Sequence, residues 1–480
     1  MGLFFTRHLR MIQKLLTKYW LAFHLAVLIL AVWVSVLYSG LGMTLGLFWL
    51  SFFTIQSFLL LPSMLRNETL GEARLRSCAN AIQDPFVYAG VALIIFACLQ
   101  WLNSGCFLIY LDDAEIWRYS APPVGWLPFS VEPYPALAVL ALFAVTILGG
   151  GIFRNGIGKA GKRFFLDMAS LFSGGIAVYM VVMSLTGNQP YSVWAAAPGG
   201  SNWGIFFGFW LIIALGGHLN FLEARFAKTV LWSVFSLLGN LLGMLHFASP
   251  LVMLLFVVMA LLIVVYWMFY LVRQTPGGIA QLKLFLCLVI AIGMTLFLFR
   301  FLFPEHPAKG KVTQLADTHY YETLFSDRQF QAPLAWKIWQ DYPWTGVGAG
   351  GFVHYSRTLI EEADWMRLNE CGGLLSNDWL QFLTEYGIIG AGLLMGLIII
   401  LLIQLFARMR VASRHLSRKK GGDGLLLGAD PYVISGIVAV TLVFALSFLF
   451  SPFQSGAMLV SFMYVLAVIP GFLPAGGGNK

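Results

Sequence analysis

Charged side chains are scarce in this chain. Asp, Glu, Lys and Arg make up 11% of its 480 residues, while 59% of the residues are hydrophobic and the mean hydropathy is +0.79. Soluble domains are only roughly 45–50% apolar. The composition therefore excludes an ordinary soluble domain and predicts a protein embedded in a membrane.

Motifs for metal and cofactor chemistry are missing as well. The five cysteines form no closely paired motif, and His306, His319 and His354 are too widely spaced to supply a compact pair of metal ligands. The glycines of residues 346–351 spell GxGxxG, but they follow Pro343 and lack the strand and helix that surround such a turn in a dinucleotide-binding fold. We therefore expect neither a metal site nor a cofactor.

Long apolar segments recur through the whole chain. Segments of about 17–25 residues can cross the hydrocarbon core as helices, which satisfy their own backbone polar groups in lipid. The sequence predicts an all-α polytopic membrane protein, with residues 1–480 forming a single integral membrane domain of about twelve transmembrane helices. The expected segments are residues 19–38, 41–65, 86–102, 136–153, 164–185, 203–219, 229–247, 250–271, 282–303, 388–406, 432–450 and 458–472.

The distribution of Lys and Arg indicates the orientation of these helices. With the N-terminus placed in the cytoplasm, 22 of the 30 basic residues fall in cytoplasmic segments and 8 fall outside, as the positive-inside rule requires. Both termini are then cytoplasmic. The net charge of +8 is spread over many short loops, which argues against nucleic-acid binding.

One large polar loop, residues 304–387, lies between the ninth and tenth predicted helices. It holds 11 of the 22 acidic residues, and the orientation above places it outside the cytoplasm. Functional residues of a membrane protein are often found in such a loop. Candidate site residues are therefore expected in this loop and at its borders.

Arg328 is the first candidate. It precedes residues 332–341, whose pattern predicts a short amphipathic helix. A guanidinium suits a diphosphate, because its planar fork donates bidentate hydrogen bonds and stays charged. The alternative is a surface ion pair with Asp327 or Glu322.

The glycine-rich turn of residues 343–352 is the second candidate. Gly346 and Gly348 either allow backbone amides to bind a phosphate group or allow the chain to turn sharply and approach a neighbouring segment closely. The sequence leaves both interpretations open.

A polar helix start is the third candidate. Asn377, Gln381 and Glu385 are spaced by four residues, and Asp378 lies three before Gln381, so the side chains share one face of a helix. Such a stripe is expected to face a protein cavity or water, because lipid penalises it. Capping of the helix by Ser376 or Asn377, with Asp378 in the first turn, explains the first residues but not Gln381 and Glu385.

Three further polar residues lie near the same membrane boundary. Arg300 and His246 stand at the ends of predicted helices, and His354 lies in the large loop. They are candidates for substrate binding or proton transfer. The alternatives are an arginine that snorkels to the interface and histidines satisfied by local hydrogen bonds.

Together these features resemble the O-antigen ligase and polymerase superfamily. The resemblance rests on Arg328, on PWTGVGAGGF at residues 343–352 and on NDWLQFLTEYGIIG at residues 377–390, with SPFQS at residues 451–455 between the last two helices. It implies a metal-independent glycosyltransferase at the periplasmic face of the bacterial inner membrane. The implied donor is a polyprenyl-diphosphate-linked glycan, and the implied acceptor is a lipid A–core sugar, another carrier-linked glycan or a protein hydroxyl; no cofactor is required.

The resemblance also implies roles for the candidate residues. Arginines would neutralise the leaving diphosphate, and a side chain near the polar helix start would orient or deprotonate the acceptor hydroxyl. The catalytic candidates are Arg328, Ser376, Glu385 and His354. The substrate-binding candidates are Arg300, His246, Gly346, Gly348, Asn377, Asp378 and Gln381.

The chain departs from the family pattern in two places. The family usually has histidine where this chain has Ser376, and many members carry an arginine in the turn that here reads LHFASP at residues 245–250. A serine is not a base at neutral pH unless it is activated, so His246, His354 or Glu385 would have to accept the proton. Two alternatives stay open: a non-catalytic family member that scaffolds envelope polysaccharide assembly, and a transporter of lipid-linked glycans.

The predicted orientation can be tested by labelling from outside the cell. A membrane-impermeant thiol reagent should label Thr318→Cys in intact cells but not Gly422→Cys, because the basic-residue distribution places residue 318 in the periplasm and residue 422 in the cytoplasm. Both positions should react after the cells are permeabilised. Labelling of Gly422→Cys in intact cells would overturn the topology.

Overall fold

The computed structural model describes residues 83–106, 108–111, 116–186, 201–224, 230–274, 318–360, 375–420, 430–454 and 456–473, together with Asp364 and six positions between 26 and 33. Most of the fold is helical. The long helices are α4 (Pro85–Leu102), α5 (Pro133–Ala144), α7 (Lys159–Leu185), α8 (Ser201–Ala224), α9 (Val230–Phe247), α10 (Pro250–Gln274), α13 (Thr318–Asp341), α16 (Asp378–Lys420), α17 (Pro431–Leu446) and α18 (Gly456–Val468). Shorter elements are η1 (Val145–Gly149), α6 (Gly150–Gly156), α14 (Gly351–Arg357), η2 (Pro452–Gln454) and η3 (Ile469–Phe472).

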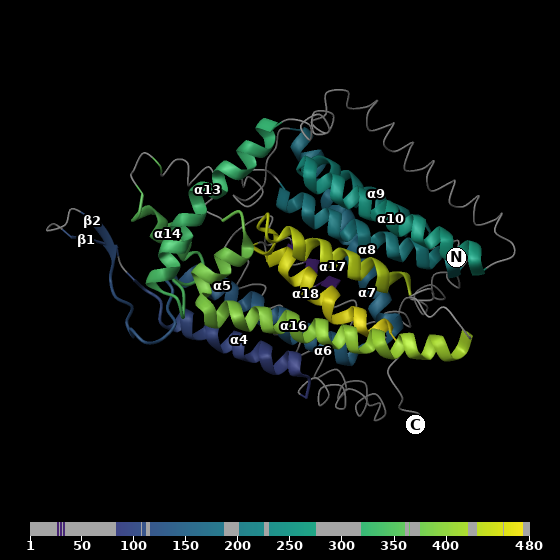
Figure 1. Ribbon diagram of the computed structural model, residues 1–480, viewed down its shortest axis with the longest axis horizontal. Coiled ribbons are helices and arrows are strands. Elements are labelled where there is room, and N and C mark those ends of the chain that lie inside the picture. Colours follow the sequence, from purple (N-terminus) through teal and green to yellow (C-terminus); the bar gives the residue numbers. More distant parts are fainter. Residues whose placement is uncertain are drawn as a thin grey trace, which may run out of the picture.

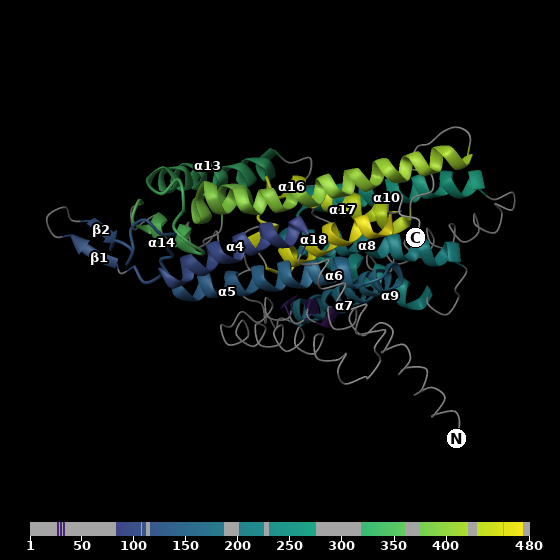
Figure 2. The same ribbon diagram turned by 90° about the horizontal axis from the view of Figure 1, so that it is seen from below.

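The apolar helices run side by side along the long axis of the molecule (Figures 1 and 2). Within the described residues, six helices are long and apolar enough to cross a membrane, and three shorter helices are apolar as well. Nine of the twelve predicted segments coincide with helices; residues 41–65, 282–303 and most of 19–38 lie outside the described part of the chain. The chain is a multi-pass membrane protein.

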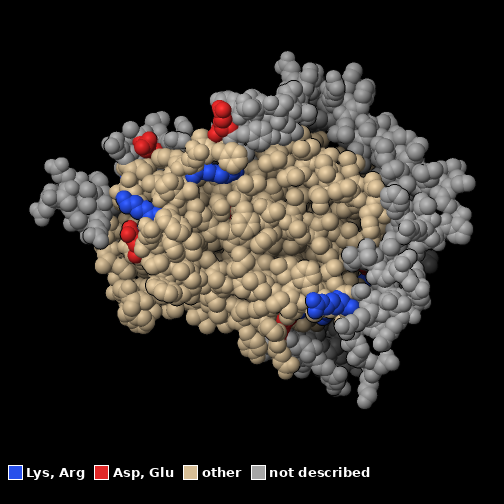
Figure 3. Space-filling view, in the orientation of Figure 1, with Lys and Arg blue, Asp and Glu red and all other residues tan. Residues whose placement is uncertain are grey.

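The surface of the bundle supports this assignment. Large apolar side chains remain exposed along it, such as Leu261 at 58% and Ile403 at 61%. Figure 3 shows a broad uncharged face with Lys, Arg, Asp and Glu at its margins. Such a surface is unfavourable in water and favourable against lipid.

Helix α8 forms the centre of the bundle. Residues 202–219 are all buried, and the helix contacts α7, α9, α10 and α17. Close approach requires small residues: a Cβ added to Gly208 would lie 2.5 Å from the Phe256 ring. A helix that is apolar on every side is expected at such a central position.

The polar elements gather at one end of the bundle. Helices α13 and α14 lie there beside an antiparallel pair of strands, β1 (Leu108–Leu111) and β2 (Ile116–Tyr119), with Leu108 opposite Tyr119 (Figures 1 and 2). This pair adds a small sheet to the predicted all-α fold. The predicted helix at residues 332–341 is too short, since α13 begins at Thr318 and continues through Pro333, so Arg328 lies within the helix and not before it.

Helix α16 is broken at Gly387, where φ is 60° and ψ is −171°. A break deprives the carbonyls before it and the amides after it of their helical partners. The turn between α13 and α14 supplies hydrogen-bond partners for the unpaired backbone groups on both sides of the break. Four backbone hydrogen bonds join the two segments: Val347 N–H to the Thr384 carbonyl (3.1 Å), Gly348 N–H to Glu385 (2.8 Å), Ile388 N–H to Pro343 (2.9 Å) and Ile389 N–H to Trp344 (3.2 Å).

A buried glutamine on α4 binds carbonyl groups of both segments at the break. The Gln100 side-chain amide donates to the carbonyls of Thr345 and Glu385, at 3.2 and 3.1 Å, and Gln100 is 1% exposed. It therefore ties α4 to both the turn and the broken helix. The polar end of the molecule is thus anchored to the bundle through backbone groups.

The glycine at the break should be intolerant of substitution. A Cβ at Gly387 would lie 2.3 Å from the Trp344 carbonyl oxygen, and φ is positive, so Gly387→Ala should cost about 2–4 kcal/mol of stability. Gly392→Ala on the same helix is the matched control, because its Cβ would meet nothing within 4 Å and alanine favours helix by about 1 kcal/mol. Thermal unfolding of the purified proteins measures both; equal midpoints would contradict this account of the break.

Candidate functional site

The candidate site is a junction between α13, the start of α16 and the loop of residues 447–454 that connects α17 to α18. We call it the motif junction. Three of the sequence-predicted side chains, Arg328, Asn377 and Asp378, bind backbone groups of this loop, and Ser376 contacts α13.

Arg328 lies on α13 and reaches the loop. Its Nη2 donates to the Leu449 carbonyl, and its guanidinium carbon lies 5.4 Å from the centre of the Phe325 ring and 5.6 Å from that of Phe450. A cation over aromatic faces is stabilised by the ring quadrupoles. These three contacts orient the guanidinium at the edge of the apolar bundle.

Asn377 contacts the same loop from the start of α16. Its Oδ1 accepts from the Leu380 amide at 3.0 Å, which caps the helix, and its Nδ2 donates to the Phe448 carbonyl at 3.1 Å. Arg328 and Asn377 therefore bind consecutive carbonyls, whose Cα atoms are about 3.8 Å apart. The capping interpretation is confirmed, and the structure brings Arg328 close to the polar helix start.

Asp378 holds the loop from the inside. Its carboxylate accepts hydrogen bonds from the amides of Phe453 (2.9 Å) and Gln454 (3.2 Å), while its own amide donates to the Ser447 carbonyl at 3.1 Å. The side chain is fully buried. Asp378 thus satisfies backbone amides of η2 and positions the loop.

Ser376 contacts α13 and not the loop. Its amide and its hydroxyl donate to the Oε1 atom of Gln331, at 3.0 and 3.3 Å. Gln331 follows Arg328 by three residues, so the two share one face of α13. Gln331 is not among the residues predicted from the sequence, although its spacing of three residues from Arg328 is a signal that could have identified it.

The predicted polar stripe of α16 faces protein rather than a cavity. Gln381 Oε1 accepts from the Leu375 amide at 2.9 Å, and its Nε2 donates to Glu385 Oε1 at 2.9 Å. The backbone amides of Gly350 and Phe352 also lie near the Glu385 carboxylate. Gln381 and Glu385 are only 2% and 5% exposed, because the glycine turn covers this face of the helix.

The glycine turn adopts the structural alternative left open by the sequence. Gly346 and Gly348 have φ values of 65° and 82°. A Cβ at Gly346 would lie 2.4 Å from the Glu385 carbonyl carbon, and one at Gly348 would lie 2.3 Å from the Ser130 backbone. The Gly348 amide already donates to Glu385, so both glycines serve a close backbone contact.

The remaining candidates are not part of the motif junction as the structure describes it. His246 Nε2 contacts Ser184 Oγ at 2.9 Å between α9 and α7. His354 on α14 pairs with Glu132 at 3.0 Å and packs edge-on against Tyr119. Arg300 lies outside the described residues.

His354 sits in a mixed electrostatic environment. Burial lowers the pKa of His354 below its ordinary value, Glu132 opposes this shift by favouring the imidazolium, and Arg357 adds to it. The imidazole is therefore biased towards its neutral form, which can accept a proton. Its side chain is 26% exposed, so solvent or a ligand can reach it.

The comparisons with known proteins concern much of this region. Residues 234–395 match the family model described as O-antigen ligase. The matched span contains α13, the glycine turn and the break in α16, but it ends before the loop of residues 447–454. A search of curated proteins found none that matches the chain.

The pKa of His354 predicts a pH-dependent stability. Because burial lowers this pKa in the folded state, the unfolded chain binds the proton first as the pH falls, and stability is lost through the ordinary pKa of about 6.5. His354→Gln should reduce the fall in unfolding temperature between about pH 7.5 and 5.5. Glu132→Gln should enlarge it, because Glu132 is the group that favours the imidazolium. An unchanged pH dependence in His354→Gln would show that this histidine does not contribute.

Proposed function

We propose that this chain, whose residues 234–395 match the O-antigen ligase family, transfers a glycan from a polyprenyl-diphosphate carrier to a hydroxyl acceptor. The family match supports glycan transfer of the ligase or polymerase type in general. The observation that carries the finer proposal is the meeting of Arg328 and Asn377 on the consecutive carbonyls of Leu449 and Phe448. It places a fixed guanidinium beside the start of α16.

The proposed reaction is a displacement at the anomeric carbon of the donor sugar. The acceptor oxygen forms a bond to this carbon, the bond from the carbon to the diphosphate oxygen breaks, and its electron pair leaves with the diphosphate. Arg328 stabilises the charge that develops on the leaving group. The diphosphate competes effectively with the neutral Leu449 carbonyl for the guanidinium, because its negative charge attracts the cation and its oxygens can accept two parallel hydrogen bonds.

The acceptor hydroxyl loses a proton in this reaction, and a group other than Arg328 must accept it. Ser376 donates to Gln331 and can orient a hydroxyl, but an unactivated serine cannot accept the proton at neutral pH. Glu385 is already engaged by Gln381 and lies near two backbone amides, which suits a structural role. We therefore assign the proton to His354, whose neutral form is favoured by burial and whose orientation is held by Glu132. Because His354 lies outside the motif junction, this assignment requires the acceptor to extend from Arg328 towards α14 or a water molecule to carry the proton.

The location of the reaction follows from the membrane helices. We place residues 304–387 and the motif junction at the periplasmic face of the bacterial inner membrane, with both termini in the cytoplasm, in line with the basic-residue distribution. The polyprenyl tail of the donor is too apolar to leave the bilayer, so the donor reaches Arg328 laterally from the membrane. Neither a metal ion nor a cofactor takes part in this proposal.

A second candidate function is a scaffold in envelope polysaccharide assembly. One observation favours it: the motif side chains Asn377, Asp378, Gln381 and Glu385 all bind groups of the protein itself. A chain that keeps these contacts but has Ser376 at the position of the family's histidine could preserve the fold without the activity. The experiment below separates the two functions.

The glycan-transfer proposal predicts that Arg328 matters more than Ser376. Arg328→Ala should reduce transfer by roughly a hundredfold, since a preorganised donor at developing charge is worth on the order of 3 kcal/mol. Arg328→Lys should restore little, because the planar fork is lost. Ser376→Ala should cost about 1 kcal/mol, and Ser376→His should raise activity. The measurement is transfer from a carrier-linked glycan by purified variants in the presence of a chelator.

Lys337→Ala is the matched control, because Lys337 is an exposed cation on the same helix. Its activity should equal that of the unmodified protein. Unfolding temperatures show whether Arg328→Ala remains folded. Full activity in a folded Arg328→Ala protein would refute the mechanism, and folded variants that are all inactive, together with an inactive parent, would favour the scaffold.

A further inference from the structure

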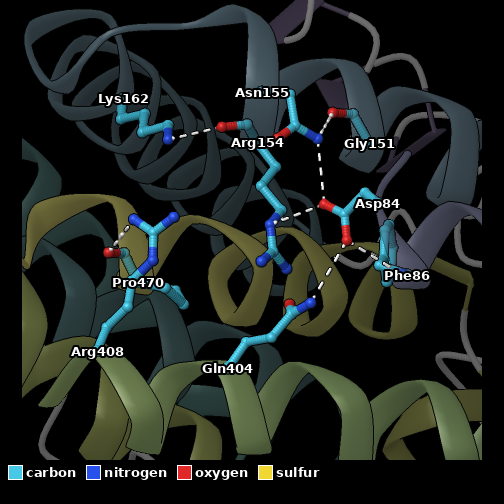
Figure 4. Close-up of polar contacts among 9 residues, drawn as sticks. All are labelled: Asp84, Phe86, Gly151, Arg154, Asn155, Lys162, Gln404, Arg408 and Pro470. Atoms are coloured by element: carbon cyan, nitrogen blue, oxygen red, sulfur yellow. Dashed lines mark hydrogen bonds and ion pairs between the residues drawn. The ribbon is translucent and has the colours of Figure 1, made fainter. Parts of the chain in front are cut away.

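A second polar cluster lies far from the motif junction, at the end of α4 remote from the strands. Asp84 caps this helix by accepting from the Phe86 amide at 3.1 Å. Its carboxylate also binds Arg154 Nε at 3.0 Å, Asn155 Nδ2 at 3.1 Å and Gln404 Nε2 at 3.5 Å (Figure 4). The cluster therefore joins α4, α6 and α16.

Positive charge exceeds negative charge in this cluster. Lys162 Nζ donates to the Arg154 carbonyl at 2.9 Å, and Arg408 Nη1 donates to the Pro470 carbonyl at 2.9 Å (Figure 4). Arg154, Lys162 and Arg408 lie close enough to repel one another, and Asp84 is the carboxylate that Figure 4 shows among them. Three cations facing one carboxylate leave an excess of two positive charges.

Among the described residues, neighbouring charges do not remove this excess. Lys159 and Arg163 both pair with Asp430, and Asp167 also interacts with Arg163, so the charges of this adjacent group balance among themselves. Arg154 has a side chain only 10% exposed, and its Nη1 atom is buried with no hydrogen-bond partner among the described residues. A buried cation with an unsatisfied donor is unfavourable unless an anion is present.

The position of the cluster relative to the membrane indicates which kind of anion it would bind. Three candidate membrane spans have an end there: Pro85–Leu102 and Lys159–Leu185 begin beside Asp84 and Lys162, and Asp378–Ala412 ends just after Arg408. The ends of membrane spans lie at the level of the lipid headgroups. Arg408 follows Asp378 by 30 residues along α16, or about 45 Å at 1.5 Å per residue, so the cluster and the motif junction lie at opposite membrane faces.

We propose that Arg154, Lys162 and Arg408 bind the phosphate of an anionic phospholipid headgroup. A phosphodiester supplies the acceptor oxygens and negative charge that the cluster lacks, and basic sites between transmembrane helices are suited to such headgroups. Arg408 is half-buried, so a headgroup at the surface can reach it. The site does not depend on the glycan-transfer proposal.

The test measures unfolding temperature in detergent with added lipid. Phosphatidylglycerol should stabilise the protein, whereas phosphatidylcholine and inorganic phosphate at equal concentration should not. Arg408→Gln and, independently, Lys162→Gln should weaken the apparent affinity for phosphatidylglycerol at least about fivefold, as expected for the loss of a charge-assisted contact. Arg410→Gln is the matched control, since Arg410 is exposed two residues further along α16.

Native mass spectrometry provides a second readout that does not depend on stability. The unmodified protein and Arg410→Gln should retain bound phosphatidylglycerol, and Arg408→Gln should lose it. Equal loss of bound phosphatidylglycerol in Arg408→Gln and Arg410→Gln would indicate general charge attraction and overturn the proposal. Stabilisation by inorganic phosphate alone would overturn the lipid assignment, and no response to any anionic lipid would overturn the site.

Discussion

The broken backbone of α16 is the constraint on which the polar end of this protein depends. At Gly387 the helix cannot provide its own hydrogen bonds, yet the segment leads directly into an apolar membrane span. Each unsatisfied backbone group would cost several kcal/mol in such surroundings. The turn of residues 343–348 provides donors on one side of the break and acceptors on the other. Neither segment can leave without exposing the polar groups of both.

The position of the candidate site follows from these backbone hydrogen bonds between the turn and α16. The turn connects α13 to α14, so fixing it to α16 also fixes the helix that carries Arg328 and Gln331. The start of α16 then binds the loop of residues 447–454 through Asn377 and Asp378. Arg328 meets the same loop at Leu449. A catalytic arrangement needs rigid support of this kind, because misplaced donors lose most of their effect.

The sequence predicted the membrane helices well and the polar region less well. Segment length and hydropathy are properties of single stretches, so nine predicted spans coincide with helices. Gln381 and Glu385 were correctly predicted to share one face of a helix. That face was expected to meet a cavity or water, but it is covered by the glycine turn of residues 343–352, which local spacing could not show. The amphipathic pattern of residues 332–341 predicted a shorter helix than α13, because a local pattern does not show that tertiary packing carries the helix through Pro333.

Other parts of the site depend on contacts that sequence spacing cannot show. Gln100 stands out as an amide within an apolar segment, which is a usable signal, but its two acceptors lie more than 240 residues away. Glu132 becomes the partner of His354 only through the fold. Ser376 retains the position of the family's histidine but binds Gln331, so motif similarity alone cannot assign its chemistry.

Hydrogen–deuterium exchange of residues 343–352 tests the central claim most directly. If the turn closes the break in α16, the amides of Val347 and Gly348 should be protected as strongly as those of Ile388 and Ile389, because each pair satisfies the other segment. Exchange of Val347 and Gly348 at the rate of a free loop, with α16 still protected, would contradict the account.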